Sequence, residues 1–152
     1  MRSQTQVIGH HHKAGAAQIL RLRTIPEVAV APGGSQVAYV VSSAWADDDH
    51  SEFLSQIHVA RSDGSGSRQL TQGDKSCVSP EWSPDGEWIA FTSGRKGFKD
   101  EMVLSEGLPQ PYGEVFAMRA NGTDVRQLTD NKWEDATIGW MPEPKPALRS
   151  SA

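Results

Sequence analysis

"SPEWSPDGEWIAFTS" occupies residues 79–93 and decides the fold. A tight turn at Pro84, Asp85 and Gly86 separates two short apolar runs, each of which contains a tryptophan. Proline fixes φ at about −65° in the second position of a tight turn, and glycine accepts the positive φ that closes it. The stretch therefore predicts two β-strands joined by a turn, which is either an isolated hairpin or one copy of a repeated unit.

The same pattern recurs along the chain. Residues 56–71, "QIHVARSDGSGSRQLT", match residues 114–129, "EVFAMRANGTDVRQLT", without a gap at an offset of 58, and six of the sixteen positions are identical. Trp82 recurs as Trp140 at the same offset, and residues 28–42 match the opening stretch at an offset of 52. A self-match at a fixed period is the signature of a repeat architecture.

Each repeated unit is predicted to contain four short strands. "WIAF" and "VAYVV" are β-prone and almost continuously apolar, which is typical of strands covered on both faces. Four-stranded units of this length are typical of β-propeller blades. We therefore predict an all-β fold of antiparallel blades, whose better copy has strands at 78–82, 87–93, 114–119 and 124–129.

The domain organisation follows from these units. We predict an N-terminal arm at 1–25 that is partly disordered or a short helix, and propeller blades over 26–142. The blades divide into 26–73, 74–131 and the start of a third at 132–142, and a disordered tail covers 143–152. A propeller closes with about four to eight blades. About two blades plus one strand make an incomplete propeller: a fragment, a truncated reading frame, or an oligomer that completes the ring between chains.

The stretches "WSPDGEWIAFTS", "EVFAMRANGTDVRQLTDN" and "WEDATIGW" resemble the TolB-type propeller repeat, and the match covers roughly residues 26–142. The resemblance implies a noncatalytic binding or interaction module with a protein or peptide partner. Similar blades occur in prolyl-oligopeptidase-family hydrolases, and residues 19–42 are similar to the start of the propeller in acylaminoacyl-peptidase-like members. The alternative is therefore a substrate-gating propeller segment of such a serine hydrolase. The first copy departs from the pattern, with Val30 for the tryptophan and Gly33 for the aspartate.

Catalysis by this chain is not expected. Hydrolases of that family carry their nucleophile in a G-x-S-x-G elbow of a separate domain. The nearest approach here is Gly33-Gly34-Ser35, but the fifth position is Val37. We therefore predict no enzyme activity, or at most the non-catalytic part of a serine peptidase.

Composition limits the partners. A formal net charge of −4 and a pI of about 5.7 argue against nucleic acid, and no apolar run is long enough for membrane insertion or a signal peptide. As written, the chain is expected to be cytoplasmic, or periplasmic if the full-length gene is TolB-like and exported. The single cysteine, Cys77, is expected to be a small buried hydrophobe. A homo-oligomer, or the missing remainder of the propeller, is the other expected partner.

No cofactor or metal is expected. Adjacent histidines at His10, His11 and His12 lack the spacing of a catalytic site, and a flexible arm explains them better. The acidic run Asp47–His50 lacks the calcium-loop pattern and is expected to be a solvated loop.

Two inserts, 43–55 and 94–113, are predicted to be loops on one edge of the array, because both fall between the second and third strands of their unit. Long loops on one edge often carry recognition. The candidate recognition residues of the second insert are Arg95, Lys96, Phe98, Lys99, Asp100 and Tyr112; the alternative is a loop folded back on its own blade. The motif residues Trp82, Pro84, Asp85, Gly86 and Trp140 are assigned a structural role, with Trp82 and Phe91 buried.

Overall fold

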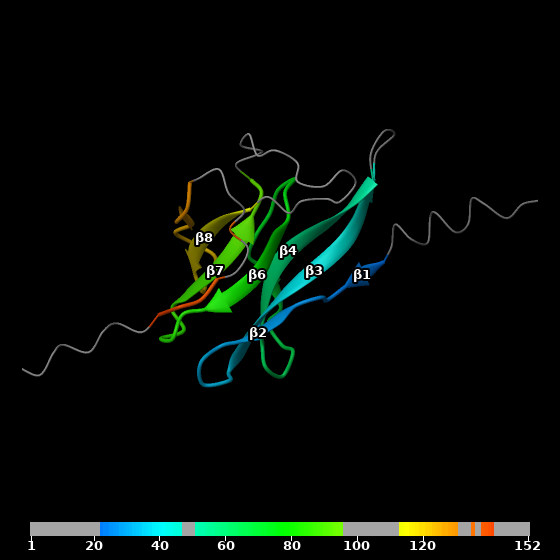
Figure 1. Ribbon diagram of the computed structural model, residues 1–152. Coiled ribbons are helices and arrows are strands. Elements are labelled where there is room, and N and C mark those ends of the chain that lie inside the picture. The colour runs from blue at the N-terminus through cyan, green and yellow to red at the C-terminus, as the bar shows by residue number, and fades with distance from the viewer. Residues whose placement is uncertain (1–21, 47–50, 96–112, 131–134, 136–137, 142–152) are drawn as a thin grey trace, which may run out of the picture.

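The computed structural model describes residues 22–46, 51–95, 113–130, 135 and 138–141 (Figure 1). These residues form two antiparallel β-sheets, and no helix occurs in the part of the chain that is described. The N-terminal arm before residue 22 and the tail after residue 141 lie outside the described residues.

The first sheet corresponds to the first predicted blade. It contains β1 (Arg23–Thr24), β2 (Val28–Val30), β3 (Gln36–Ala46), β4 (Ser51–Arg61) and β5 (Arg68–Gln69). Both β1 and β2 pair with β3, and β4 and β5 follow on its other side. Since β4 pairs along all of β3, β1 and β2 share the opposite edge and together form one interrupted inner strand.

The second sheet has the order β6 (Cys77–Trp82), β7 (Trp88–Ser93), β8 (Glu114–Arg119) and β9 (Arg126–Gln127). β6, β7 and β8 match their predicted ranges to within one residue at each end, and β9 is shorter than the predicted 124–129. Every neighbouring pair is antiparallel, as hairpin connections require. The four-stranded antiparallel units are those of an incomplete propeller.

The first insert is not the loop that the sequence predicts. Residues 43–46 and 51–55 continue β3 and β4, and Ser43 pairs with Leu54 and Ala44 with Phe53. Antiparallel extension gives these backbone groups hydrogen-bond partners that a solvated loop would leave to water. The result is a long hairpin that rises beyond the rest of its sheet in Figure 1. The acidic run at 47–50 lies outside the described residues.

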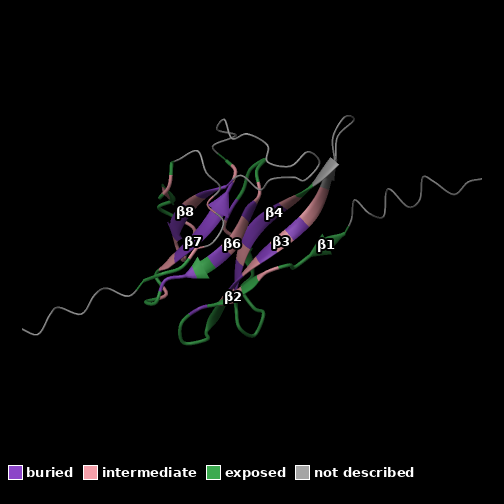
Figure 2. Ribbon diagram, in the orientation of Figure 1, coloured by how far each residue is buried: buried purple, intermediate pink, exposed green. Residues whose placement is uncertain are grey.

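The core lies where the two sheets face each other, as the buried segments of β3, β4, β6 and β7 in Figure 2 illustrate. Trp82 is 8% exposed and Phe91 is fully buried, so both were correctly predicted to be core residues. Ile57 of β4 and Met118 of β8 are also fully buried. Burying each such side chain contributes about 1.5–3 kcal/mol, so packing between sheets is a principal source of stability.

The threonine that ends each "RQLT" stretch holds the outer strand to its neighbour. Thr71 Oγ1 accepts the Ile57 N–H at 2.8 Å, and Thr129 Oγ1 accepts the Val115 N–H at 2.9 Å. Each hydroxyl also donates to the side chain one residue earlier in the adjacent strand, Gln56 or Glu114. These motif side chains are therefore used by the scaffold.

Candidate functional site

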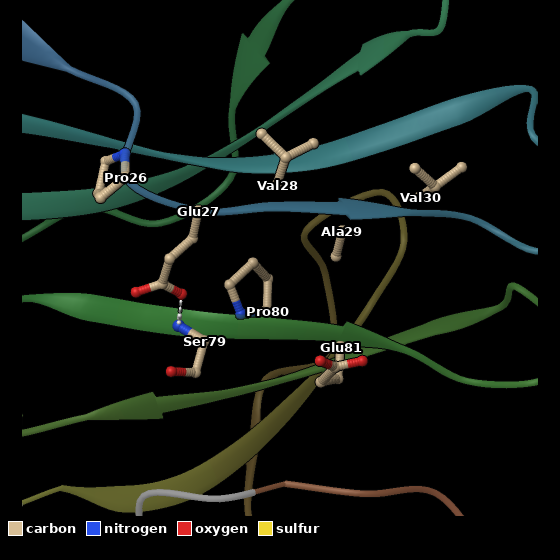
Figure 3. Close-up of a pocket in the computed structure, with 8 residues that line it drawn as sticks. All are labelled: Pro26, Glu27, Val28, Ala29, Val30, Ser79, Pro80 and Glu81. Carbon is tan, nitrogen blue, oxygen red and sulfur yellow. Dashed lines mark hydrogen bonds between the residues drawn. The ribbon is translucent and has the colours of Figure 1, made fainter.

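The strongest candidate site is a groove between the inner strands of the two blades, with a volume of about 470 Å³. Figure 3 shows β2 on one side and β6 on the other. We call this the interblade groove; its lining residues are Pro26, Glu27, Val28, Ala29, Val30, Ser79, Pro80 and Glu81.

An irregular stretch of β6 forms one wall of the groove. The β6–β7 register shifts between Val78 and Glu81, which is a β-bulge, and Ser79 within it has a φ of 53°. A positive φ is uncommon for serine and stores backbone strain. The Ser79 N–H donates to Glu27 Oε2 at 2.6 Å, and this bond crosses from one blade to the other (Figure 3). Glu27 thus holds the bulge in place.

The other wall is β2, which pairs with β3 along one edge. Its other edge pairs with no strand among the described residues, and we call it the free edge. The Val40 N–H donates to the Glu27 carbonyl at 3.0 Å, and the Ala31 N–H donates to the Gln36 carbonyl at 2.9 Å. Because antiparallel strands alternate between bonded and non-bonded pairs, Ala29 also turns its backbone groups toward β3. The N–H and C=O of Val28 and Val30 consequently point away from β3, toward the inner side of the sheet.

The electrostatics of the groove are negative. Two of its eight lining residues, Glu27 and Glu81, are acidic, and none is basic. Glu27 is half-buried and Glu81 is exposed. Such a site can bind positively charged groups and can pair with an extended backbone. Ser79 is the only hydroxyl residue of the eight, and none of them is a histidine that could activate it.

The repeated tryptophans make the same contact twice. Trp82 Nε1 donates to the Ala29 carbonyl at 3.1 Å, and Trp140 Nε1 donates to the Glu81 carbonyl at 3.1 Å. Ala29 and Glu81 are themselves matched positions, 52 residues apart. Each tryptophan therefore ties its own segment to the inner strand of the preceding blade, which favours a packing role over ligand stacking.

The Pro-Asp-Gly turn is also a local structural device. Asp85 Oδ1 accepts the Ser83 hydroxyl at 2.5 Å and the Glu87 N–H at 2.9 Å. These hydrogen bonds, that from Ser83 first, hold the pKa of the Asp85 carboxyl below its usual value. Gly86 has a φ of 72°, and a Cβ atom at this position would lie 3.8 Å from Pro32 Cδ. The turn therefore packs against the first blade as well.

Of the six candidate recognition residues in the second insert, only Arg95 belongs to the described residues. Its Nη2 donates to Cys77 Sγ at 3.0 Å, and its guanidinium lies 5.5 Å from the Phe91 ring and 5.1 Å from the Phe116 ring. This arginine therefore folds back on its own blade, and Cys77 is buried. The other five predicted residues lie outside the described part of the chain: Lys96, Phe98, Lys99, Asp100 and Tyr112.

The metal candidates fall outside the described residues as well. His10–His12 and Asp47–His50 are not placed, and within the described ranges no three histidine, cysteine or acidic side chains gather as metal ligands. Nor does the described part of the chain include a helix long and apolar enough to cross a membrane.

Sequence reasoning missed Glu27 and Ser79, the two residues that join across the groove. No local motif marks either residue. The alignment at an offset of 52 does place Glu27 on Ser79. Matched positions in consecutive blades are candidates for neighbours, and that signal would have identified the pair.

Comparison with solved structures defines the class of protein. A TM-score of 0.53 relates the chain to a protein from Agrobacterium tumefaciens assigned as TolB, over 76% of this chain and 34% of that one, with 23% sequence identity. At that identity the likeness establishes the fold. The two described sheets are blades of a TolB-like β-propeller.

The sequence relatives include peptidases and TolB proteins, the two kinds of protein that the resemblance implies. Dipeptidyl-peptidase 5 of Porphyromonas endodontalis is 35% identical over 73% of this chain, and the uncharacterized peptidase YuxL of Bacillus subtilis is 28% identical over 84%. The Tol-Pal system protein TolB of Desulfosudis oleivorans is 36% identical over 41%. The chain spans 14%, 17% and 14% of these proteins, respectively. No family model matches the chain. The chain is thus a TolB-like or peptidase-related propeller segment.

Proposed function

We propose that this chain is a noncatalytic, propeller-type binding module. The interblade groove carries the proposal, because it combines free backbone groups on β2 with the carboxylates of Glu27 and Glu81. That combination holds a ligand through hydrogen bonds and charge, whereas hydrolysis by a serine needs an activating base beside the hydroxyl. A protein or peptide partner is further supported by the relatives named Tol-Pal system protein TolB, which by name belong to a system of proteins.

Two measurements on the full chain test this proposal. Backbone amide resonances of Ala29, Ser79 and Glu81 should shift when extended peptides are added. An activated ester and a fluorophosphonate probe should detect no serine-dependent reaction. Ester turnover that is abolished by Ser79→Ala or Ser35→Ala would overturn the noncatalytic assignment. A slow background rate that survives both substitutions agrees with it, since His10–His12 can catalyse such hydrolysis weakly.

A second candidate function is the substrate-gating segment of a prolyl-oligopeptidase-family serine hydrolase. The similarity to dipeptidyl-peptidase 5 and YuxL, which extends over most of this chain, favours it. In that case the gene should continue into a G-x-S-x-G motif followed by an aspartate and a histidine within about 300 residues. Reading the neighbouring frame, and assaying peptide hydrolysis by the longer product, distinguishes this candidate from a self-standing binding module.

A further inference from the structure

We infer that the interblade groove takes one particular kind of partner: an extended polypeptide strand that adds to the free edge of β2 and turns basic side chains toward Glu27 and Glu81. The inference rests on the proposed binding function and names its ligand class. Two separate features of the groove support it, one in the backbone and one in the side chains.

The backbone feature is the free edge. Val28 and Val30 stand opposite Tyr39 and Val37 in non-bonded pairs, so their N–H and C=O groups face away from β3. They are two residues apart, which is the repeat of an extended chain and about 6.6–6.8 Å along the strand. An added peptide strand can therefore pair with both residues in one register, as in the β-strand addition used by many peptide-binding domains.

The side-chain feature is the contrast between the two faces of β2. Val28 and Val30 are 60% and 62% exposed on one face, and Ala29 points the other way, toward β6 (Figure 3). Side chains of an added strand would alternate in the same manner. One row would lie beside the two valines and should be apolar. The other row would enter the groove beside the small Ala29 side chain.

Charge determines what the second row should be. Glu27 uses Oε2 to hold the Ser79 N–H, and in the described part of the chain its Oε1 accepts no hydrogen bond. Glu81 presents a second carboxylate from β6, and its carbonyl is held by Trp140. Lysine or arginine side chains satisfy two such carboxylates, whereas acidic side chains would be repelled. The preferred partner is therefore a strand that alternates apolar and basic residues.

The binding experiment uses the full chain and an acetylated, amidated peptide of alternating lysine and valine, with an alternating glutamate and valine peptide as control. Fluorescence anisotropy measures affinity, and amide shifts of Ala29 and Ser79 locate the site. We expect only the lysine peptide to bind at the groove. Two further lysine peptides carry N-methyl groups on every second residue, along one edge or the other. One of them should bind at least about tenfold more weakly, because it cannot donate to β2.

Protein variants separate the backbone and charge contributions. Val28→Pro removes an N–H that β3 does not use, and should weaken binding about tenfold, whereas Val28→Thr keeps the N–H and should bind normally. Glu81→Gln should weaken binding of the lysine peptide several-fold. Glu87→Gln is its control, because Glu87 pairs with Arg119 outside the groove.

Three results would overturn the inference: equal affinity of both N-methylated peptides, equal affinity of the glutamate peptide, or lysine-peptide shifts confined to residues away from β2 and β6. The methylated peptides keep the test decisive even if Val28→Pro does not fold. Binding of both the lysine and the glutamate peptide at the groove would refute the preference for basic strands, but it would still agree with the proposed binding module. Serine-dependent hydrolysis would instead contradict the proposed function, which is noncatalytic binding.

Discussion

Leu70 and Leu128 occupy matched positions in the two blades, but within the described part of the chain a following blade covers Leu70 alone. A Cβ atom at Gly122 of the second blade would lie 3.2 Å from Leu70 Cδ2, so the turn there packs directly on this leucine. Leu128 is 57% exposed. The same residue in the same motif is thus an interface residue in one blade and an open apolar surface in the other.

The arginines of the same motif differ in a parallel way. Arg68 donates to the carbonyls of Asn121 and Ala120 at 2.9 and 3.2 Å, and so links the first blade to the second. Arg126 instead pairs with Asp124 at 2.6 Å, and its guanidinium lies 4.8 Å from the Trp88 ring. Contact with a neighbouring blade, rather than the motif itself, decides what these side chains bind.

Aromatic pairs on the opposite faces complete the comparison. In the second blade Phe91 stacks on Phe116 with centroids 5.6 Å apart, and both are buried against the first blade. At the matched positions the first blade stacks Tyr39 on His58 at 5.4 Å, and both are only partly buried. Burial, and then Arg23, lower the pKa of the His58 imidazole. The aromatic pair that meets a neighbouring blade is apolar, whereas the matched pair, which has no neighbouring blade among the described residues, carries polar atoms.

The largest expected difference between matched residues concerns the two tryptophans. Trp82→Ala should reduce the free energy of unfolding by about 3–5 kcal/mol, because it empties a buried site between the blades. Trp140→Ala should cost only about 1 kcal/mol, since this side chain is 37% exposed. Denaturant titration followed by circular dichroism measures both. Equal losses would mean that the second blade is covered as fully as the first.

Association of the chain should respond to the open face of the second blade. A pocket of about 280 Å³ lies there, lined by apolar residues that include Val115, Leu128 and Ile138. Apolar patches of this kind usually mark interfaces or aggregation sites. Sedimentation at micromolar concentration should show species larger than the 16.6 kDa chain, and Leu128→Lys should shift them toward monomer.

The opposite outcome would change the interpretation of the fold. A stable, cooperatively unfolding monomer that binds no hydrophobic dye would contradict an incomplete propeller and favour a self-contained β domain. Lysine at Thr123, an exposed position on the same blade, is the matched control for surface charge. Thr123→Lys should leave the sedimentation profile unchanged.

The sequence predicted the second blade well because its signals are local. Turn residues and apolar runs placed β6 to β9 within a few residues, and the repeat register identified Trp82 as a core residue. The extension of β3 and β4 was not predicted, because "SAWADDDHSE" lacks continuous apolar patterning and its pairing depends on the partner strand. The groove was not predicted because Glu27 and Ser79 meet only after two blades pack.

Glycine substitutions provide a finer test of the blade contact. Gly64 and Gly122 share a φ near 83°, at 83° and 84°, but nothing lies within 4 Å of a Cβ at Gly64. Gly64→Ala should therefore cost only the strain of a left-handed backbone, about 1–2 kcal/mol. Gly122→Ala carries the same strain and must also displace Leu70. Denaturant titration should show a larger loss in the free energy of unfolding for Gly122→Ala than for Gly64→Ala. Equal losses would indicate that the Leu70 side chain moves aside at no energetic cost.

The smallest expected effect is a pH-dependent change in the free energy of unfolding, and it distinguishes the turn at Asp85 from the matched turn at Gly33. Gly33 in the first blade stands where the second blade has Asp85, whose pKa is lowered by the hydrogen bonds from Ser83 and Glu87. A carboxyl with a depressed folded-state pKa stabilises the fold above its unfolded pKa of about 3.9. That contribution is lost as the pH falls through the lower folded-state value.

Asp85→Asn keeps an acceptor but removes the titration, so its stability deficit should be present near neutral pH and shrink on acidification. Asp63 and Asp124 also have lowered pKa values, so the parent chain should lose stability in acid even without Asp85. The informative quantity is therefore the difference between Asp85→Asn and the parent chain, measured by thermal unfolding over a pH series from neutral into the acid range. Because Asp85 is solvent-exposed, salt should reduce only the minor contribution from Arg119, and the hydrogen-bonded part should persist. A deficit that stays constant over the whole pH range would show that Asp85 acts through turn geometry alone, as the glycine turn of the first blade does.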